Sequence, residues 1–114
     1  MERHREVFND GFLAYGHKIT QRSETGKRVG ETFNQEGKLA FKKLSVRESD
    51  YQMAGHIGAK LDLKVKSLYP PSFRSIDKNK LKIVISTMEY DVIKVDADRY
   101  YLYFYLQEAG AANE

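Results

Sequence analysis

The three histidines are the residues best suited to acid–base or metal chemistry in this chain, because imidazole titrates near neutral pH and binds transition metals. They are His4, His17 and His56. Each falls in a different segment, and none has a second histidine or a carboxylate at the spacing that metal ligands need on one face. The chain has no cysteine, which excludes thiolate ligands and cysteine nucleophiles. We therefore predict that each histidine is an ordinary surface residue.

Two pairs of carboxylates are candidates for holding a divalent cation, Glu89 with Asp91 and Asp96 with Asp98. Asp96 and Asp98 flank a predicted tight turn, where aspartate is favoured for its local hydrogen bonding alone. The sequence has no Gly-rich phosphate loop, no GxSxG and no HExxH motif. We predict no metal, no cofactor and no enzymatic activity.

The most aromatic segment, residues 99–107, reads as a final strand with two distinct faces. Its first face is predicted to be core and consists of Tyr100, Leu102, Phe104 and Leu106. The other face carries Tyr101, Tyr103 and Tyr105, which could stack nucleic-acid bases or form a protein interface. Net charge over residues 83–114 is −4, which would repel phosphate, so we predict that these tyrosines form a subunit interface or simply pack within the fold rather than bind nucleic acid.

A basic stretch over residues 60–82 carries a net charge of +5. Lys64 and Lys66 are predicted on the solvent side of a strand, where lysine also guards against edge-to-edge aggregation. The loop residues Arg74, Lys78 and Lys80 are better candidates for a partner contact. A basic middle and an acidic C-terminal third could meet in neighbouring copies of a ring, although solvated faces are the simpler interpretation.

The chain has 114 residues, which is enough for one domain over residues 1–114 and too few for two. Hydrophobic residues make up 41% and charged residues 31%, a balance that suits a folded domain. The charged N-terminus is not expected to be a secretory signal, and no apolar run reaches the roughly 20 residues that span a bilayer. Residues 1–11 are predicted to be an arm and residues 108–114 a tail.

Alternating apolar and polar residues predict six or seven strands joined by short turns. The predicted strands cover residues 12–22, 27–33, 38–44, 61–66, 81–86, 90–95 and 99–107. Turns are expected at 24–26 and near 86–89, a polar loop at 34–38, and a basic loop at 72–80 after the two prolines. Sequential strands with short turns predict a mainly β fold, either a small antiparallel barrel or a sandwich.

One short helix interrupts the strands. Ser45 and Glu48 have the spacing of a capping box, and Gly55 and Gly58 are helix-ending residues. The pattern predicts a helix over residues 46–57.

The order of segments resembles the head-tail adaptor or head-closure family of tailed phages. The similarity starts with the run Phe41-Lys-Lys-Leu-Ser-Val-Arg-Glu-Ser-Asp-Tyr51, in which a strand leads through a Ser-Val step into a short helix. A glycine-containing stretch at 55–58 and a leucine-rich strand at 61–65 follow. Segments 89–92 and 101–106 resemble the family's returning and terminal strands. The turn at 86–89 lacks the Asn-Gly of many relatives, and the loop at 69–80 is longer and more basic.

The resemblance implies a virion protein, made in the host cytoplasm, whose copies form a ring below the portal. The ring closes the DNA channel after packaging and presents a docking surface to the tail. Implied partners are the portal or adaptor ring protein, a tail-completion or tail-terminator protein, further copies of the chain and, non-specifically, packaged DNA; no membrane is implied. We predict that the hairpin at 22–38 reaches into the channel through Glu24, Gly26, Lys27, Arg28, Gly30 and Gly37. Ring contacts are predicted for the three tyrosines and for Gln52 and His56 on the helix.

Two other interpretations remain open from the sequence. A tail-completion or other connector protein would use a similar barrel. An oligonucleotide-binding β-barrel module would also be small, aromatic and basic.

Overall fold

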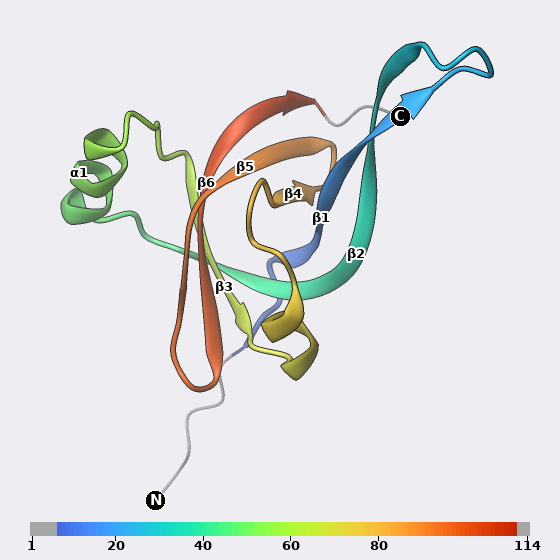
Figure 1. Cartoon of the computed structure of the whole chain (residues 1–114). Coiled ribbons are helices and arrows are strands. Elements are labelled where there is room, and N and C mark those ends of the chain that lie inside the picture. Colours follow the sequence, from blue (N-terminus) through green and yellow to red (C-terminus); the bar gives the residue numbers. More distant parts are fainter. Residues whose placement is uncertain (1–6, 112–114) are drawn as a thin grey trace, which may run out of the picture.

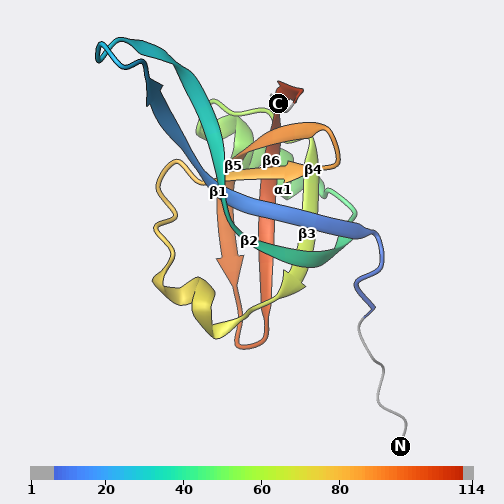
Figure 2. The same cartoon turned by 90° about the vertical axis from the view of Figure 1, so that its right-hand side faces the viewer.

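The computed structural model describes residues 7–111, which form a closed antiparallel β-barrel with one α-helix on its side (Figures 1 and 2). The elements are β1 (Gly11–Arg22), β2 (Arg28–Leu44), α1 (Glu48–His56), β3 (Leu63–Leu68), a short 3-10 helix η1 (Pro71–Ser75), β4 (Lys82–Ile85), β5 (Met88–Ala97) and β6 (Tyr101–Ala111). Around the barrel the strands follow the order β1-β2-β3-β6-β5-β4, and β4 pairs with β1 to close it. The mainly β prediction is confirmed, and of its two forms the barrel is correct.

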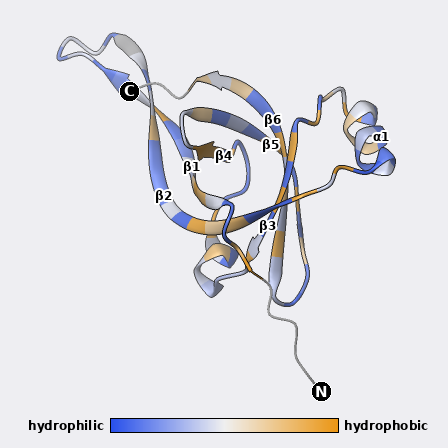
Figure 3. Cartoon of the chain, turned by 180° about the vertical axis from the view of Figure 1, so that it is seen from behind, coloured by the Kyte–Doolittle hydropathy of each residue, from blue (hydrophilic) through white to orange (hydrophobic). Residues whose placement is uncertain are grey.

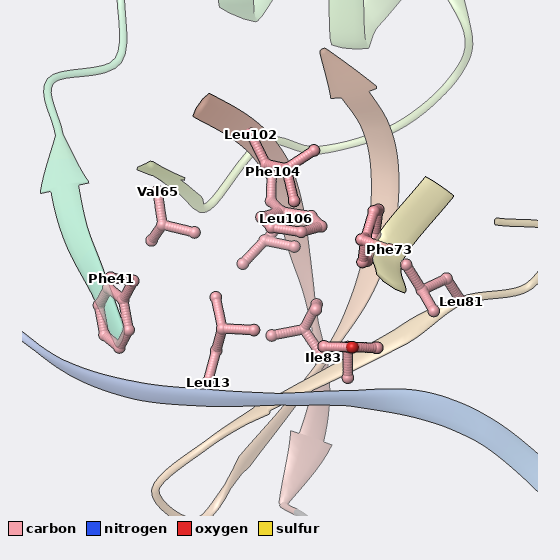
Figure 4. Close-up of a cluster of buried hydrophobic side chains, with 10 residues drawn as sticks. Leu13, Phe41, Val65, Phe73, Leu81, Ile83, Leu102, Phe104 and Leu106 are labelled. Atoms are coloured by element: carbon pink, nitrogen blue, oxygen red, sulfur yellow. The ribbon is translucent and has the colours of Figure 1, made fainter. Parts of the chain in front are cut away.

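The core fills the barrel interior with buried side chains from β1, β2, β3, β4 and β6 (Figure 4), and half-buried side chains of β5 pack against them. In β6 the inward residues Leu102, Phe104 and Leu106 are fully buried, as strand alternation predicted. Tyr100 was assigned to the same face, but it precedes β6 in the turn and is 62% exposed. The remaining core side chains are Leu13, Tyr15, Phe41, Val65, Phe73, Leu81 and Ile83.

Phe73 comes from η1 rather than from a strand. Its ring makes edge-to-face contacts with Tyr15, Tyr69 and Phe104, with ring centres 5.2, 6.2 and 5.8 Å apart. Because η1 lies at one end of the barrel (Figure 1), this ring closes that end of the core. The predicted basic loop at 72–80 therefore contributes a side chain to the core.

The predicted loop at 34–38 is wrong. These residues continue β2, which runs unbroken for 17 residues. A register shift opposite Tyr15 and Gly16 takes up the extra residue, Glu36, as a β-bulge. The polar, glycine-containing stretch therefore bends the strand instead of ending it.

The helix begins two residues later than predicted. The backbone N–H of Arg47 donates to the carboxylate of Asp50 at 2.9 Å, so Arg47 and Asp50 take the places assigned to Ser45 and Glu48. Ala54 is the buried residue of α1 and packs with Leu61 and Tyr105 on the outside of the barrel. No helix within residues 7–111 is long and apolar enough to cross a membrane.

The first and last strands extend further toward the ends of the chain than predicted. Gly11 already belongs to β1, and residues 108–111 belong to β6 rather than to a tail. Residues 7–10 of the predicted arm precede β1 without regular structure, and the remaining residues of the arm and tail, 1–6 with His4 and 112–114, lie outside the described part.

Candidate functional site

A long hairpin formed by β1 and β2 projects from the barrel (Figures 1 and 2). β1 pairs with β4 only from Leu13 to Gly16, and β2 pairs with β3 only from Phe41 to Leu44. Between these points the two strands pair with each other alone, up to a turn at residues 23–27. The turn is hydrophilic (Figure 3), and among the described side chains of residues 17–36 none is buried.

The structure separates the residues predicted for the channel loop into two groups. Glu24, Gly26 and Lys27 form the exposed turn, where Gly26 has a φ of 85° that favours glycine. Gly30 lies in the projecting part of β2, and the side chain of Arg28 lies outside the described part.

Gly37 does not belong to the projecting tip, which corrects its assignment to the channel loop. It lies opposite Tyr15, where the hairpin joins the barrel wall. A β-carbon on Gly37 would meet the Tyr15 ring, so glycine is required there by packing.

His17 braces the base of the hairpin. Its Nδ1 bonds to the carboxylate of Glu36 on β2. Its Nε2 is buried without a well-formed hydrogen bond and faces the backbone carbonyls of Asp77 and Asn79 in the loop before β4. The hydrogen bond to Glu36 raises the pKa of His17 above 6.5, although burial opposes it. The side chain is therefore not the ordinary surface histidine that the sequence predicted.

A cleft of about 670 Å³ lies beside this brace. Two ion pairs hold its walls, Lys18 with Glu89 at 2.9 Å and Lys82 with Asp91. The side chains of Lys18 and Glu89 are only 18% and 11% exposed, so this pair ties the hairpin to β5. The pair of Lys82 with Asp91 links β4 to β5, so both ion pairs hold together the elements that line the cleft.

The outward tyrosines of β6 lie in a mixed lysine and aspartate setting, not in a purely acidic one. Lys66 on β3 lies 4.1 Å from the ring centre of Tyr101 and 5.6 Å from that of Tyr103. The Tyr103 hydroxyl donates to Asp98 at 3.1 Å. Burial and this hydrogen bond raise the pKa of Tyr103.

Tyr105 is only 7% exposed because α1 covers it, so its assignment to a subunit interface is wrong. The sequence alone could not show this, since strand alternation does not reveal what covers the outer face. Tyr101 and Tyr103 are half-buried. Asp96 accepts a hydrogen bond from the Tyr105 hydroxyl at 3.4 Å.

Lys64 points outward as alternation predicted, but it is not solvated. Its ammonium pairs with Asp50 at 3.1 Å, and their side chains are only 12% and 13% exposed. This pair links β3 to the first turn of α1, beside a second cleft of about 490 Å³. The cleft also contacts Arg47 and Tyr103, so it lies between the helix and the β6 tyrosines.

The remaining candidates for partner contact lie on the surface, on α1 and in the loop around η1. Gln52 and His56 are exposed on α1, and Arg74 and Lys80 are exposed in the loop around η1. Lys78 is exposed too, and its ammonium donates to the carbonyls of Phe73 and Ile76, at 3.1 Å each, so it also stabilises the end of η1.

The acidic pairs considered for a cation all have protein partners. Glu89 and Asp91 pair with the cleft lysines, and Asp98 accepts the backbone N–H groups of Tyr100 and Tyr101 at 2.9 and 2.8 Å. Between residues 7 and 111 there is no group of three or more His, Cys, Asp or Glu side chains that could hold a metal ion.

The chain is thus a closed β-barrel with a helix on its side and a long hairpin that extends beyond the barrel wall. No protein-family model matches the chain, and no curated protein matches its sequence.

Proposed function

We propose that this chain is a structural virion protein of a tailed phage, a head-closure subunit that forms a ring below the portal or its adaptor. The observation that carries the proposal is the β1–β2 hairpin, which extends beyond all other strand pairing. A ring of barrels can direct such hairpins to a common axis, where polar tips would obstruct a DNA channel. This role requires shape and contacts, and no catalysis.

The braced base of the hairpin supports the same role. A channel plug must resist the pressure of packaged DNA and still move when the tail delivers the genome. The ion pair of Lys18 with Glu89 and the contact of His17 with Glu36 hold the base, whereas the contacts of residues 23–27 with other described residues are local. Motion would therefore be concentrated in the outer hairpin.

The decisive experiment interrupts the gene in the phage that encodes it and examines the lysate by electron microscopy. Free tails beside unjoined heads that have lost their DNA would support head closure, and intact virions would refute it. Purified protein is then added back in two forms. A shortened form replaces residues 19–32 with a two-residue turn, and a control keeps the hairpin length but scrambles residues 23–27.

The shortened form keeps Leu13, Tyr15 and Phe41, and so it should fold. We expect it to lose DNA retention, whereas the scrambled form should retain part of it. Equal DNA retention with both forms would assign closure to another part of the subunit.

One observation favours an oligonucleotide-binding module as the second candidate, namely the position of Lys66 over Tyr101 and Tyr103. Against it, Tyr105 is covered and Asp96 and Asp98 stand beside the tyrosines. Fluorescence anisotropy with single-stranded DNA separates the candidates. A module would bind with a steep salt dependence, and a connector weakly or not at all.

A further inference from the structure

The barrel end that bears η1 and the β5–β6 turn exposes an aromatic surface. In Figures 1 and 2 this end lies away from the projecting hairpin. Leu68 and Tyr100 are 57% and 62% exposed, the largest apolar exposures in this part of the barrel. Leu68 pairs with Tyr101 across β3 and β6, and the ring centres of Tyr100 and Tyr101 are 6.4 Å apart. We call Leu68, Tyr100 and Tyr101 the aromatic end.

Two arginines flank the aromatic end. The guanidinium of Arg99 lies 5.5 Å from the ring centre of Tyr100, and that of Arg74 lies 5.6 Å from the ring centre of Tyr69. The backbone N–H of Tyr69 donates to the carbonyl of Tyr100 at 2.9 Å, so the residues that carry the two arginine contacts are neighbours in the backbone at this end of β3 and β6. Within the described part of the chain, neither guanidinium forms an ion pair.

The one acidic residue of the adjoining turn is already engaged. Asp98 accepts two backbone N–H groups and the Tyr103 hydroxyl, and these hydrogen bonds lower the pKa of its carboxyl. The arginines are therefore left to face solvent beside exposed apolar side chains. Arginine stacked on tyrosine presents a fork of N–H donors that matches a carboxylate, and both residue types are enriched at the centres of protein interfaces.

We propose that the aromatic end, with Arg74 and Arg99, docks an acidic protein segment in which carboxylates alternate with apolar side chains. The carboxylates would pair with the two guanidinium groups, and the apolar side chains would cover Leu68 and Tyr100. The charge of the patch selects this occupant, since another basic or purely apolar segment would leave the arginines unpaired. The proposal is independent of head closure, because it concerns the end of the barrel opposite the hairpin.

The test measures binding of a fluorescein-labelled peptide that alternates glutamate with leucine to the full chain by anisotropy. The peptide should bind, and the double variant Arg74→Ala, Arg99→Ala should weaken binding about tenfold or more. The matched control, Lys43→Ala with Lys60→Ala, removes the same charge from exposed positions elsewhere and should leave the affinity within about twofold. The variant Tyr100→Ser should weaken binding without changing charge.

Results of three kinds would overturn the proposal. The first is a failure of the peptide assay: either the acidic peptide does not bind, or both double variants lose the same affinity for it. The second is tighter binding of oligothymidylate at the same salt concentration, lost on removal of the two arginines, which would assign the surface to nucleic acid. The third is concentration-dependent dimerisation of the chain alone that Arg74→Ala with Arg99→Ala abolishes, which would assign it to a second copy. Thermal unfolding of each variant ensures that lost binding is not lost folding.

Discussion

The ring of Tyr15 occupies the space where Gly37 would carry a side chain. A β-carbon built on Gly37 would come within 2.2 Å of the Tyr15 hydroxyl oxygen and 2.3 Å of the adjoining ring carbon. Tyr15 cannot turn aside easily, because it is buried and packs edge-to-face on Phe73. The contact joins the base of the hairpin to the core.

Replacing Gly37 with alanine should therefore destabilise the barrel. We expect a loss of roughly 1–3 kcal/mol in the free energy of unfolding, the usual cost of overpacking a core. Urea denaturation followed by circular dichroism measures it.

Gly55→Ala is the matched control, since Gly55 is a helical glycine with nothing within 4 Å of the added carbon. Alanine should stabilise α1 by roughly 0.5 kcal/mol, because it restricts the unfolded chain more than glycine does. A loss of stability in both variants would contradict the specific role of the Tyr15 contact.

Phe73→Ala should be among the most destabilising single substitutions. The side chain is fully buried and contacts three other aromatic rings, and such truncations cost about 3–5 kcal/mol through lost burial and a residual cavity. Phe12→Ala is the control, because Phe12 is 59% exposed on β1 and should change stability by less than about 1 kcal/mol. Equal urea midpoints for the two variants would show that η1 does not close the core.

These two phenylalanines also show what the sequence could predict. Alternation correctly placed Leu102, Phe104 and Leu106 of β6 inward, because strand geometry alone sets which side chains share a face, but it failed at Tyr100, which lies in the turn before the strand. Phe73 follows two prolines in a basic segment without any periodicity, so nothing local signals its burial. In β1 the conspicuous apolar residues Phe12 and Ile19 are exposed, whereas Leu13 and Tyr15 are buried.

The candidate site was predictable only in part, for the same reason. The hairpin turn at Gly26 has a local signal, a glycine among polar residues, and its position was predicted correctly. The pairing of His17 with Glu36 joins residues on two strands across a bulge, and the burial of Tyr105 depends on where α1 packs. Contacts between distant segments leave no trace in residue spacing.

Asp50→Asn should loosen α1 from the barrel. Burial acts to raise the pKa of Asp50, but the Arg47 N–H and the Lys64 ammonium outweigh it, so the pKa lies below 3.8. A lowered pKa stabilises the fold above about pH 3.8, and this contribution is lost as the pH falls through the folded-state value. At pH 7 we expect the variant to lose roughly 1–3 kcal/mol, because Lys64 stays mostly buried without its counter-ion.

The measurement compares urea unfolding of wild type and Asp50→Asn at pH 7 and pH 3, with Glu48→Gln as an exposed control in the same helical turn. The difference from wild type should shrink at pH 3 for Asp50→Asn alone. A difference that is independent of pH would mean that the amide disrupts packing rather than the ion pair.

His17 should make the stability of the barrel depend on pH near neutrality. Its hydrogen bond to Glu36 raises its pKa in the folded state above the 6.5 of the unfolded chain. The protonated ring then stabilises the fold fully below about pH 6.5, and this contribution is lost as the pH rises through the higher folded-state value. Unfolding free energies measured from pH 5.5 to pH 9 should fall across that interval in the wild type and much less in His17→Gln. Glu36→Gln should flatten the profile similarly, because it removes the carboxylate that raises the pKa of His17, whereas His56→Gln on exposed α1 should leave the profile unchanged. A wild-type profile that His17→Gln and Glu36→Gln leave intact would show that this pair does not brace the hairpin.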